Sequence, residues 1–220
     1  MATIASEAGS GLALDAALTT TRNLDNGLGG SGTRAWANPG TGTFIRGDGA
    51  GAFYGESDSA RAWVAIASAN YQATIDFNLS AGCNLIVGGC KTTAGGVWDA
   101  GVVALLVGTS DLRIREYDAG GSPTDRATLT ISPALSTGTN YKLQFIRSGN
   151  NWTARVLNSS GAVVGNATLP YAAASTPSGT YWGFGFLNGG TTAVLDNFLV
   201  EDAAAAAVTI KSRRRKIRWF

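Results

Sequence analysis

Short runs in which every second residue is apolar begin near residue 43 and continue almost to the end of the chain. The clearest is Tyr71–Leu79, where polar residues fill the alternate positions. This period of two is typical of a strand with one buried face. Residues 101–108 are apolar at nearly every position, which indicates a strand buried on both faces. Residues 148–150, Ser-Gly-Asn, predict a hairpin turn between two such runs.

About a dozen of these segments follow one another with no convincing amphipathic helix between them. Parallel strands need crossover connections, usually helices, so the pattern favours antiparallel pairing. The predicted fold is therefore all-β, an antiparallel two-sheet jelly-roll sandwich with extended N- and C-terminal arms. We place a flexible or assembly arm at 1–42, with a short helical turn near 14–18. The sandwich follows at 43–202, and an alanine linker with a basic tail at 203–220.

The composition is poor in charge and lacks histidine altogether. Hydrophobic residues make up 45% of the 220 residues and charged residues 15%, which argues against a disordered chain or a coiled coil. Without histidine, the commonest general base and metal ligand are missing. The last ten residues hold six of the 17 basic side chains and none of the 15 acidic ones. Residues 1–210 therefore carry a net charge of −4.

Nothing in the sequence predicts a membrane segment. The most apolar stretches, such as Val102–Val107, are far shorter than the roughly 20 residues that a spanning helix needs. The first residues lack the basic start of a secretory signal, so we expect synthesis in a cytoplasm without export by that route. Cys83 and Cys90 are expected to be free thiols that serve as small core residues.

Three motifs in the second half carry a resemblance to a known family. The first is a Y-x-L-x-F strand at 141–145, the second is G-F-G-F at 183–186, and the third is V-x-D-N-F-x-V at 194–200. Over about residues 60–202 they resemble the concanavalin A-like lectin/glucanase superfamily, in its laminin-G-like branch. The resemblance implies two stacked antiparallel sheets, one of which often binds glycans. Members include lectins, carbohydrate-binding modules, glycosidases and structural domains of virus particles.

Catalysis is not expected. Glucanases of this superfamily place paired carboxylates on one strand in an E-x-D-x-(x)-E arrangement, so that an acid and a nucleophile flank the glycosidic bond. None of the four glutamates belongs to such a cluster, and Glu116 is expected to be solvated at a strand end. A serine or cysteine triad would lack its histidine. We predict that the protein is not an enzyme.

Asp196 is the one candidate metal ligand. Some relatives hold calcium at the matching position, whereas in others the aspartate only accepts hydrogen bonds from backbone amides. Calcium requires six to eight oxygen ligands, and no D-x-D-x-D segment supplies them here. We therefore predict no cofactor, with calcium at Asp196 as the alternative. Asp111, Asp118 and Asp125 are expected at loop tips.

Exposed aromatic residues could stack on sugar rings, and the candidates for glycan binding are Trp98, Tyr181 and Trp182. Tyr181 and Trp182 are adjacent in a strand and must face opposite ways, so one of them is expected to be exposed. The alternative for each is a place in the sandwich core. Trp152 shares its strand face with apolar residues and is predicted to be core.

The basic tail has three interpretations. Clustered cations with Trp219 could bind nucleic acid, or the tail could be a solvated end. The third is docking on a partner protein, which we favour because apolar residues alternate among the arginines. We expect residues 208–220 to become ordered on a capsid or tail protein or on another copy of the chain. The candidate docking residues are Arg213, Arg214, Arg215, Lys216, Ile217, Arg218, Trp219 and Phe220.

These features together suggest a virion. Arms at both ends, no catalytic cluster and no export signal fit a non-enzymatic phage structural protein, such as a capsid decoration, head-fibre or tail component. It would be assembled in the host cytoplasm and attached through its termini to other virion proteins. Cell-surface glycans are further candidate ligands. The alternative is a carbohydrate-binding module of a bacterial surface or secreted protein.

Overall fold

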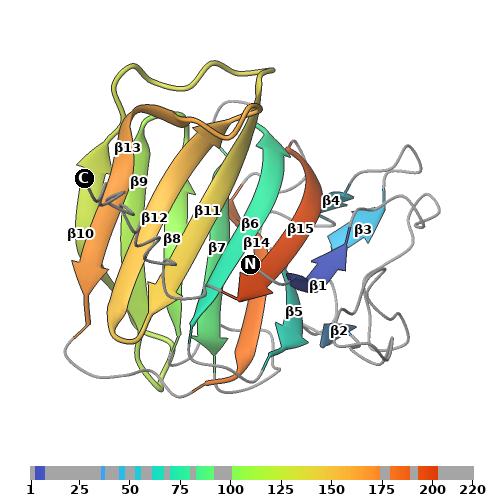
Figure 1. Cartoon of the computed structure of the whole chain (residues 1–220), viewed down its shortest axis with the longest axis vertical. Helices are drawn as coiled ribbons and strands as arrows, with labels where there is room; N and C mark the ends of the chain where they lie inside the picture. Colours follow the sequence, from blue (N-terminus) through green and yellow to red (C-terminus); the bar gives the residue numbers. More distant parts are fainter. Residues whose placement is uncertain are drawn as a thin grey trace, which may run out of the picture.

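The computed structural model describes residues 3–7, 36–37, 45–47, 53–55, 61–66, 70–79, 83–91, 101–173, 179–188 and 193–202. Every regular element in these ranges is a β-strand, and all strand pairs are antiparallel. The strands form two sheets stacked face to face (Figure 1). The predicted two-sheet antiparallel sandwich is thus confirmed. The described ranges contain no helix of the length and apolar character that a membrane span requires.

The first sheet has eight strands in the order β13-β12-β11-β6-β15-β4-β3, with β1 paired to β15 beside β4. Its elements are β1 (Thr3–Glu7), β3 (Ile45–Gly47), β4 (Phe53–Gly55), β6 (Tyr71–Asn78), β11 (Asn140–Ser148), β12 (Asn151–Asn158), β13 (Val163–Ala172) and β15 (Val194–Asp202). Its central strands come from distant parts of the chain, because β6 lies between β11 and β15.

The second sheet has seven strands in the order β10-β9-β8-β7-β14-β5-β2. Its elements are β2 (Trp36–Ala37), β5 (Arg61–Ala65), β7 (Asn84–Lys91), β8 (Val102–Val107), β9 (Asp111–Tyr117), β10 (Pro123–Thr130) and β14 (Tyr181–Asn188). Consecutive strands β7 to β10 pair in sequence order, as in a meander.

The alternation in the sequence accounts for the inner faces. On β6 and just after it, the five apolar residues at odd positions from Tyr71 to Leu79 are at most 3% exposed, so the predicted buried face is confirmed. The hairpin at 148–150 is confirmed as well, since Ser148 pairs with Asn151 and Gly149 has a φ of 61°. Cys83 is buried in the main core, as predicted, whereas the side chain of Cys90 lies outside the described residues.

Aromatic rings join the two sheets across the core. The ring of Trp152 on β12 stacks on Phe145 at a centroid distance of 5.0 Å and on Trp182 of β14 at 6.2 Å. Tyr71 of β6 meets Trp182 edge to face at 5.2 Å. All four side chains are at most 1% exposed, so the prediction that Trp152 belongs to the core is confirmed. The indole of Trp182 is therefore a contact point for three strands of the opposite sheet.

The seven-stranded sheet is apolar on its outer face as well. A second buried cluster there consists of Trp63, Ile86, Val103, Leu105 and Tyr117, and Tyr181 packs against it. Their strand neighbours, such as Val64 and Val87, belong to the main core on the other face. This two-sided burial explains the continuous apolar run of β8, as the sequence indicated.

The outer face of the seven-stranded sheet becomes charged at β9 and β10. Arg115 contacts Asp125 at 2.6 Å, and Arg113 contacts both Asp125 and Asp111 at 3.0 and 3.3 Å. The hydrogen bond from Arg115 lowers the pKa of Asp125, against the opposing effect of burial. The prediction that Asp111 and Asp125 lie at loop tips is wrong, since both lie in strands that place them beside arginines. Asp118 does lie in a turn, where its carboxylate accepts from the backbone of Gly120.

Two strands arise within the predicted N-terminal arm. Thr3–Glu7 pairs with β15 and Trp36–Ala37 pairs with β5, so strands begin before the boundary set at residue 43. They were missed because strands of five and two residues at a sheet edge carry no sustained periodicity. The rest of the arm, the helical turn near 14–18, and residues 203–220 lie outside the described residues.

The two sheets are tied together along one edge. Asn166 on β13 accepts from the backbone N of Ser132 at 2.8 Å and donates to the carbonyl O of Thr130 at 3.0 Å. Further along the same edge, Glu116 on β9 accepts from Arg126 at 2.7 Å and from the Tyr171 hydroxyl at 3.4 Å, so it is not simply solvated as predicted. These bonds link edge strand β13 of one sheet to the β9–β10 edge of the other.

Candidate functional site

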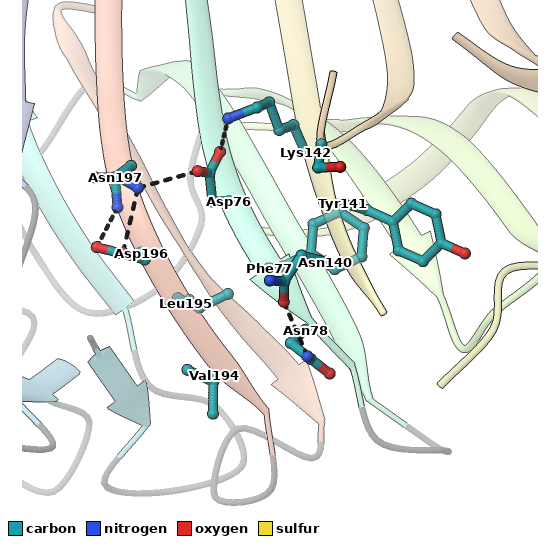
Figure 2. Close-up of a pocket in the computed structure, with 11 residues that line it drawn as sticks. Asp76, Phe77, Asn78, Asn140, Tyr141, Lys142, Val194, Leu195, Asp196 and Asn197 are labelled. Carbon is teal, nitrogen blue, oxygen red and sulfur yellow. Dashed lines mark hydrogen bonds and ion pairs between the residues drawn. The ribbon is translucent and has the colours of Figure 1, made fainter. Parts of the chain in front are cut away.

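A pocket of about 360 Å³ lies on the outer face of the eight-stranded sheet, where β6, β11 and β15 run side by side. Figure 2 shows its polar side chains converging from the three strands. The register explains the convergence, because Asp76 pairs with Lys142 on one side and with Asp196 on the other. The polar lining residues are Asp76, Asn78, Asn140, Lys142, Ser159, Asp196 and Asn197.

Asp76 is the centre of the polar network. Its Oδ1 accepts a charge-assisted hydrogen bond from the Lys142 ammonium at 2.6 Å, and its Oδ2 accepts from Asn197 Nδ2 at 3.0 Å. The side chains of Asp76 and Lys142 are 24% and 30% exposed, so both remain accessible from solvent. Because each oxygen has a bonded partner, the orientation of the carboxylate is fixed.

Asn197 owes its position to an irregularity in β15. The pairing of β15 with β6 shifts register between Asp196 and Leu199, which is the signature of a β-bulge. Asn197 has a φ of 50°, a left-handed conformation that asparagine tolerates better than most residues. Its Nδ2 also donates to Asp196 Oδ2 at 3.2 Å, and its backbone N donates to Asp196 Oδ1 at 2.7 Å. The bulge therefore places one amide between two carboxylates.

The other end of the pocket combines amides with an apolar wall. Asn78 Nδ2 donates to Asn140 Oδ1 at 2.9 Å, across the β6–β11 pair. Val194, at the start of β15, is 46% exposed and lines the same end. The pocket thus offers carboxylate acceptors, amide and ammonium donors, and a small apolar surface to one ligand.

The next question is whether the pocket could hold a metal ion. Within the described ranges, no group of three or more His, Cys, Asp or Glu side chains is placed to hold a metal ion. Asp196 accepts hydrogen bonds from both the backbone and the side chain of Asn197, which corresponds to the structural role preferred above over calcium. Binding of calcium at Asp196 stays an open prediction.

The structure corrects one of the predicted glycan-binding residues. Trp182 is 0% exposed within the core, so its ring cannot stack on a sugar. It packs against Gly89, where an added Cβ would overlap the indole. Tyr181 is the partly exposed member of the pair, but it lies on β14 of the seven-stranded sheet, in the sheet opposite the pocket. Trp98 and the tail residues 213–220 lie outside the described residues.

Of the predicted site residues that the structure describes, the pocket includes Asp196 alone. The sequence contained a local signal for two others, since Asp76 and Asn78 occupy the polar positions of the clearest strand. Lys142 and Asn140 belong to a strand more than 60 residues further on, and Asn197 follows Asp76 by 121 residues. Their meeting depends on the order of strands in the sheet, which no local pattern reveals.

Comparisons with known proteins identify the fold. Neither a family model nor a curated protein sequence matches the chain. Among solved structures, it is similar to the carbohydrate-binding module CBM66 from Bacillus subtilis. The TM-score is 0.50 and the identity 11%, and the match covers 87% of this chain and 98% of that chain. The chain has a lectin-like jelly-roll fold.

Two more structures illustrate the range of this fold. The exoplasmic/lumenal domain of VIP36 in a Ca²⁺- and Man2-bound form matches with a TM-score of 0.54 and 8% identity, over 82% of this chain and 85% of that chain. The CBM2 module of the evolved Dit protein of Lactobacillus casei BL23 phage J-1 matches with a TM-score of 0.49 and 13% identity, over 91% and 96%. At identities of 11% and 8%, the similarity to CBM66 and to the VIP36 domain shows the fold alone.

Proposed function

We propose that the chain is a non-enzymatic binding protein whose lectin-like sandwich holds a carbohydrate in the pocket between β6, β11 and β15. The observation that carries the proposal is the fixed network of Asp76, Lys142 and Asn197 at an accessible surface. Each sugar hydroxyl can both donate and accept, so it suits carboxylates and amides lying side by side. Because these groups already hold each other in place, binding costs little side-chain entropy.

The fold agrees with this proposal without deciding it. CBM66 is a carbohydrate-binding module by name, and the VIP36 domain was solved with mannose residues bound. Folds of this kind host several functions, so the weight rests on the pocket of this chain. The pocket has the polar convergence and the apolar edge that small-ligand sites share.

A binding role is favoured over catalysis by the surroundings of the carboxylates. A glycosidase needs one carboxyl in an environment that keeps it protonated, beside another that stays ionised. Asp76 accepts hydrogen bonds from Lys142 and Asn197, and Asp196 accepts them from Asn197, so nitrogen donors face both carboxylates. Such a pair is suited to accepting bonds from a ligand rather than to donating a proton.

Replacing Asn197 with glycine tests the pocket. Glycine adopts the left-handed backbone at no steric cost, so the melting temperature should change little. Loss of the amide releases the carboxylates of Asp76 and Asp196 from their fixed orientation, so binding should weaken by about tenfold. The measurement is titration calorimetry with an oligosaccharide first identified by screening the intact protein on a glycan array.

Asn151→Ala is the matched control, because it removes an exposed amide from the same sheet at the opposite end of the β11–β12 hairpin from Asn140. It should leave the affinity unchanged. An intact protein that binds no glycan, or an Asn197→Gly variant that binds as tightly as the intact chain, would contradict a carbohydrate site in this pocket.

We further propose that the sandwich is displayed on a virion, attached through its terminal segments. One geometric feature favours attachment of this kind. Thr3 pairs with Glu201, so the first and last described strands meet at one end of the sheet (Figure 1). The pocket lies toward the other end of β15, where Asp196 and Val194 are roughly 16 and 23 Å from Glu201 along the strand. A carrier that held the termini would leave the pocket facing outward.

The virion proposal is tested by mass spectrometry of purified phage particles from the host that produces this chain. We expect the chain at a fixed copy number relative to the major capsid or tail protein. Finding it in the cell fraction or culture medium but in no particle would contradict a virion role. That result would favour the alternative, a carbohydrate-binding module of a bacterial surface protein.

A further inference from the structure

We infer that the pocket selects uncharged saccharides and discriminates against sugars that carry carboxylate or sulfate groups. This inference rests on the proposed carbohydrate function and names the class of ligand. Its basis is the balance of charge in the pocket and the way in which the cationic group is already used.

The lining contains two carboxylates and one ammonium group. Asp76 and Asp196 contribute two negative charges and Lys142 one positive charge, which leaves the pocket with a net charge of −1. The other lining residues are uncharged: amides, a serine, a tyrosine and apolar residues. An acidic sugar that enters the pocket is therefore repelled by its net negative charge.

The single cation is committed to the pocket itself. Lys142 Nζ lies 2.6 Å from Asp76 Oδ1, a short charge-assisted contact between two partly shielded groups. An acidic ligand that accepted from the other hydrogens of this ammonium would bring a third negative charge to a single cation that already faces Asp76. A hydroxyl group can instead donate to the carboxylate while the ion pair stays intact.

The side-chain amide of Asn197 is likewise already bonded to carboxylates of the pocket. Its Nδ2 donates to Asp76 at 3.0 Å and to Asp196 at 3.2 Å, so both of its hydrogens point at carboxylates of the pocket. The remaining bonding capacity of the network consists largely of acceptor oxygens. Acceptors of this kind bind the O–H groups of sugars and repel anionic oxygens.

Among the described side chains on this face of the sheet, two further charges leave this balance unchanged. On the same face of the sheet, Glu201 of β15 accepts from Gln72 at 3.1 Å and adds a further negative charge. Arg155 lies on β12, separated from β6 by β11, and pairs in register with Gln144. These two charges are opposite in sign and lie outside the pocket.

The experiment compares matched sugars that differ only in charge. Gluco-, manno-, galacto- and xylo-oligosaccharides would be titrated beside counterparts of equal length that contain glucuronate, mannuronate or galacturonate. We expect the neutral member of the bound pair to bind at least about fivefold more tightly, the effect of one unit charge near contact in water. Added salt should reduce this difference, since screening weakens repulsion between exposed charges.

Three variants of the pocket and one control outside it show whether the discrimination arises in the pocket. Asp76→Asn and Asp196→Asn each remove one negative charge and should narrow the preference, and the double variant, with a net charge of +1, should abolish or reverse it. Glu201→Gln removes a carboxylate from the same strand outside the lining and should preserve the preference. Thermal melting confirms that each variant is folded, and Asp196→Asn serves if Asp76→Asn is unstable.

The outcomes separate this inference from the proposed function. An intact protein that binds an acidic sugar as tightly as its neutral counterpart, or more tightly, would overturn the inference and leave carbohydrate binding in place. A preference that is unchanged in the double variant would overturn it as well. Binding to no member of any pair would overturn the carbohydrate function, and this inference with it.

Discussion

Replacing Trp182 with alanine is expected to lower the free energy of unfolding by about 3–5 kcal/mol, the usual cost of emptying a core site of this size. The indole is 0% exposed and meets rings from β6 and β12 at 5.2 and 6.2 Å. Truncation would leave a cavity between the two sheets, at the point where Gly89 lies against the ring. Denaturant unfolding followed by tryptophan fluorescence or circular dichroism measures the loss.

Tyr181→Ala is the matched control, because this neighbour has the same backbone surroundings but a partly exposed side chain on the other face of the sheet. It should lower the free energy of unfolding clearly less than Trp182→Ala does. A domain of this size is stable by only about 5–15 kcal/mol, so Trp182→Phe provides a milder second variant that keeps a ring in the site. Unfolding energies unchanged by both Trp182 variants would contradict a core position.

The neighbouring residues Tyr181 and Trp182 show what the alternation of apolar and polar residues can predict and what it cannot. Alternation established that Tyr181 and Trp182 face opposite ways, and it placed the apolar residues of β6 correctly because one face of that strand is polar. On β14 the same reasoning could not choose a face, since the seven-stranded sheet is apolar on both sides. Which residue enters the core there is decided by the rings of the opposite sheet.

The candidate site was predictable only in part for a similar reason. The Asp196-Asn197 pair drew attention through its motif, and Asp76 was visible as an outward-facing position. The bulge that gives Asn197 its φ of 50°, and the contact of Lys142 with Asp76, depend on strands 66 to 121 residues apart in sequence. Such contacts are set by strand order and register, which are properties of the assembled sheet.

Gly165→Ala is expected to lower the free energy of unfolding by about 2–4 kcal/mol, as the sum of two costs. Gly165 has a φ of 50°, where a side chain strains the backbone. An added Cβ would also overlap the carbonyl O of Ser132 and lie 3.0 Å from its carbonyl carbon. Since this neighbour is backbone, it can yield only by moving the chain that Asn166 holds through its bonds to Ser132 and Thr130.

A variant of a second glycine, Gly149, measures the cost of backbone strain without the cost of steric overlap. Gly149→Ala places a side chain at a φ of 61° with no heavy atom within 4 Å of the new Cβ, so it should cost only about 1–2 kcal/mol of backbone strain. The excess loss in Gly165→Ala then measures the tie between β13 and the segment after β10. Urea unfolding of both variants gives this difference, and hydrogen exchange at the Ser132 amide should quicken in Gly165→Ala alone. Equal losses in the two variants would mean that the edge yields freely, and that the sandwich is closed mainly by the aromatic rings around Trp182.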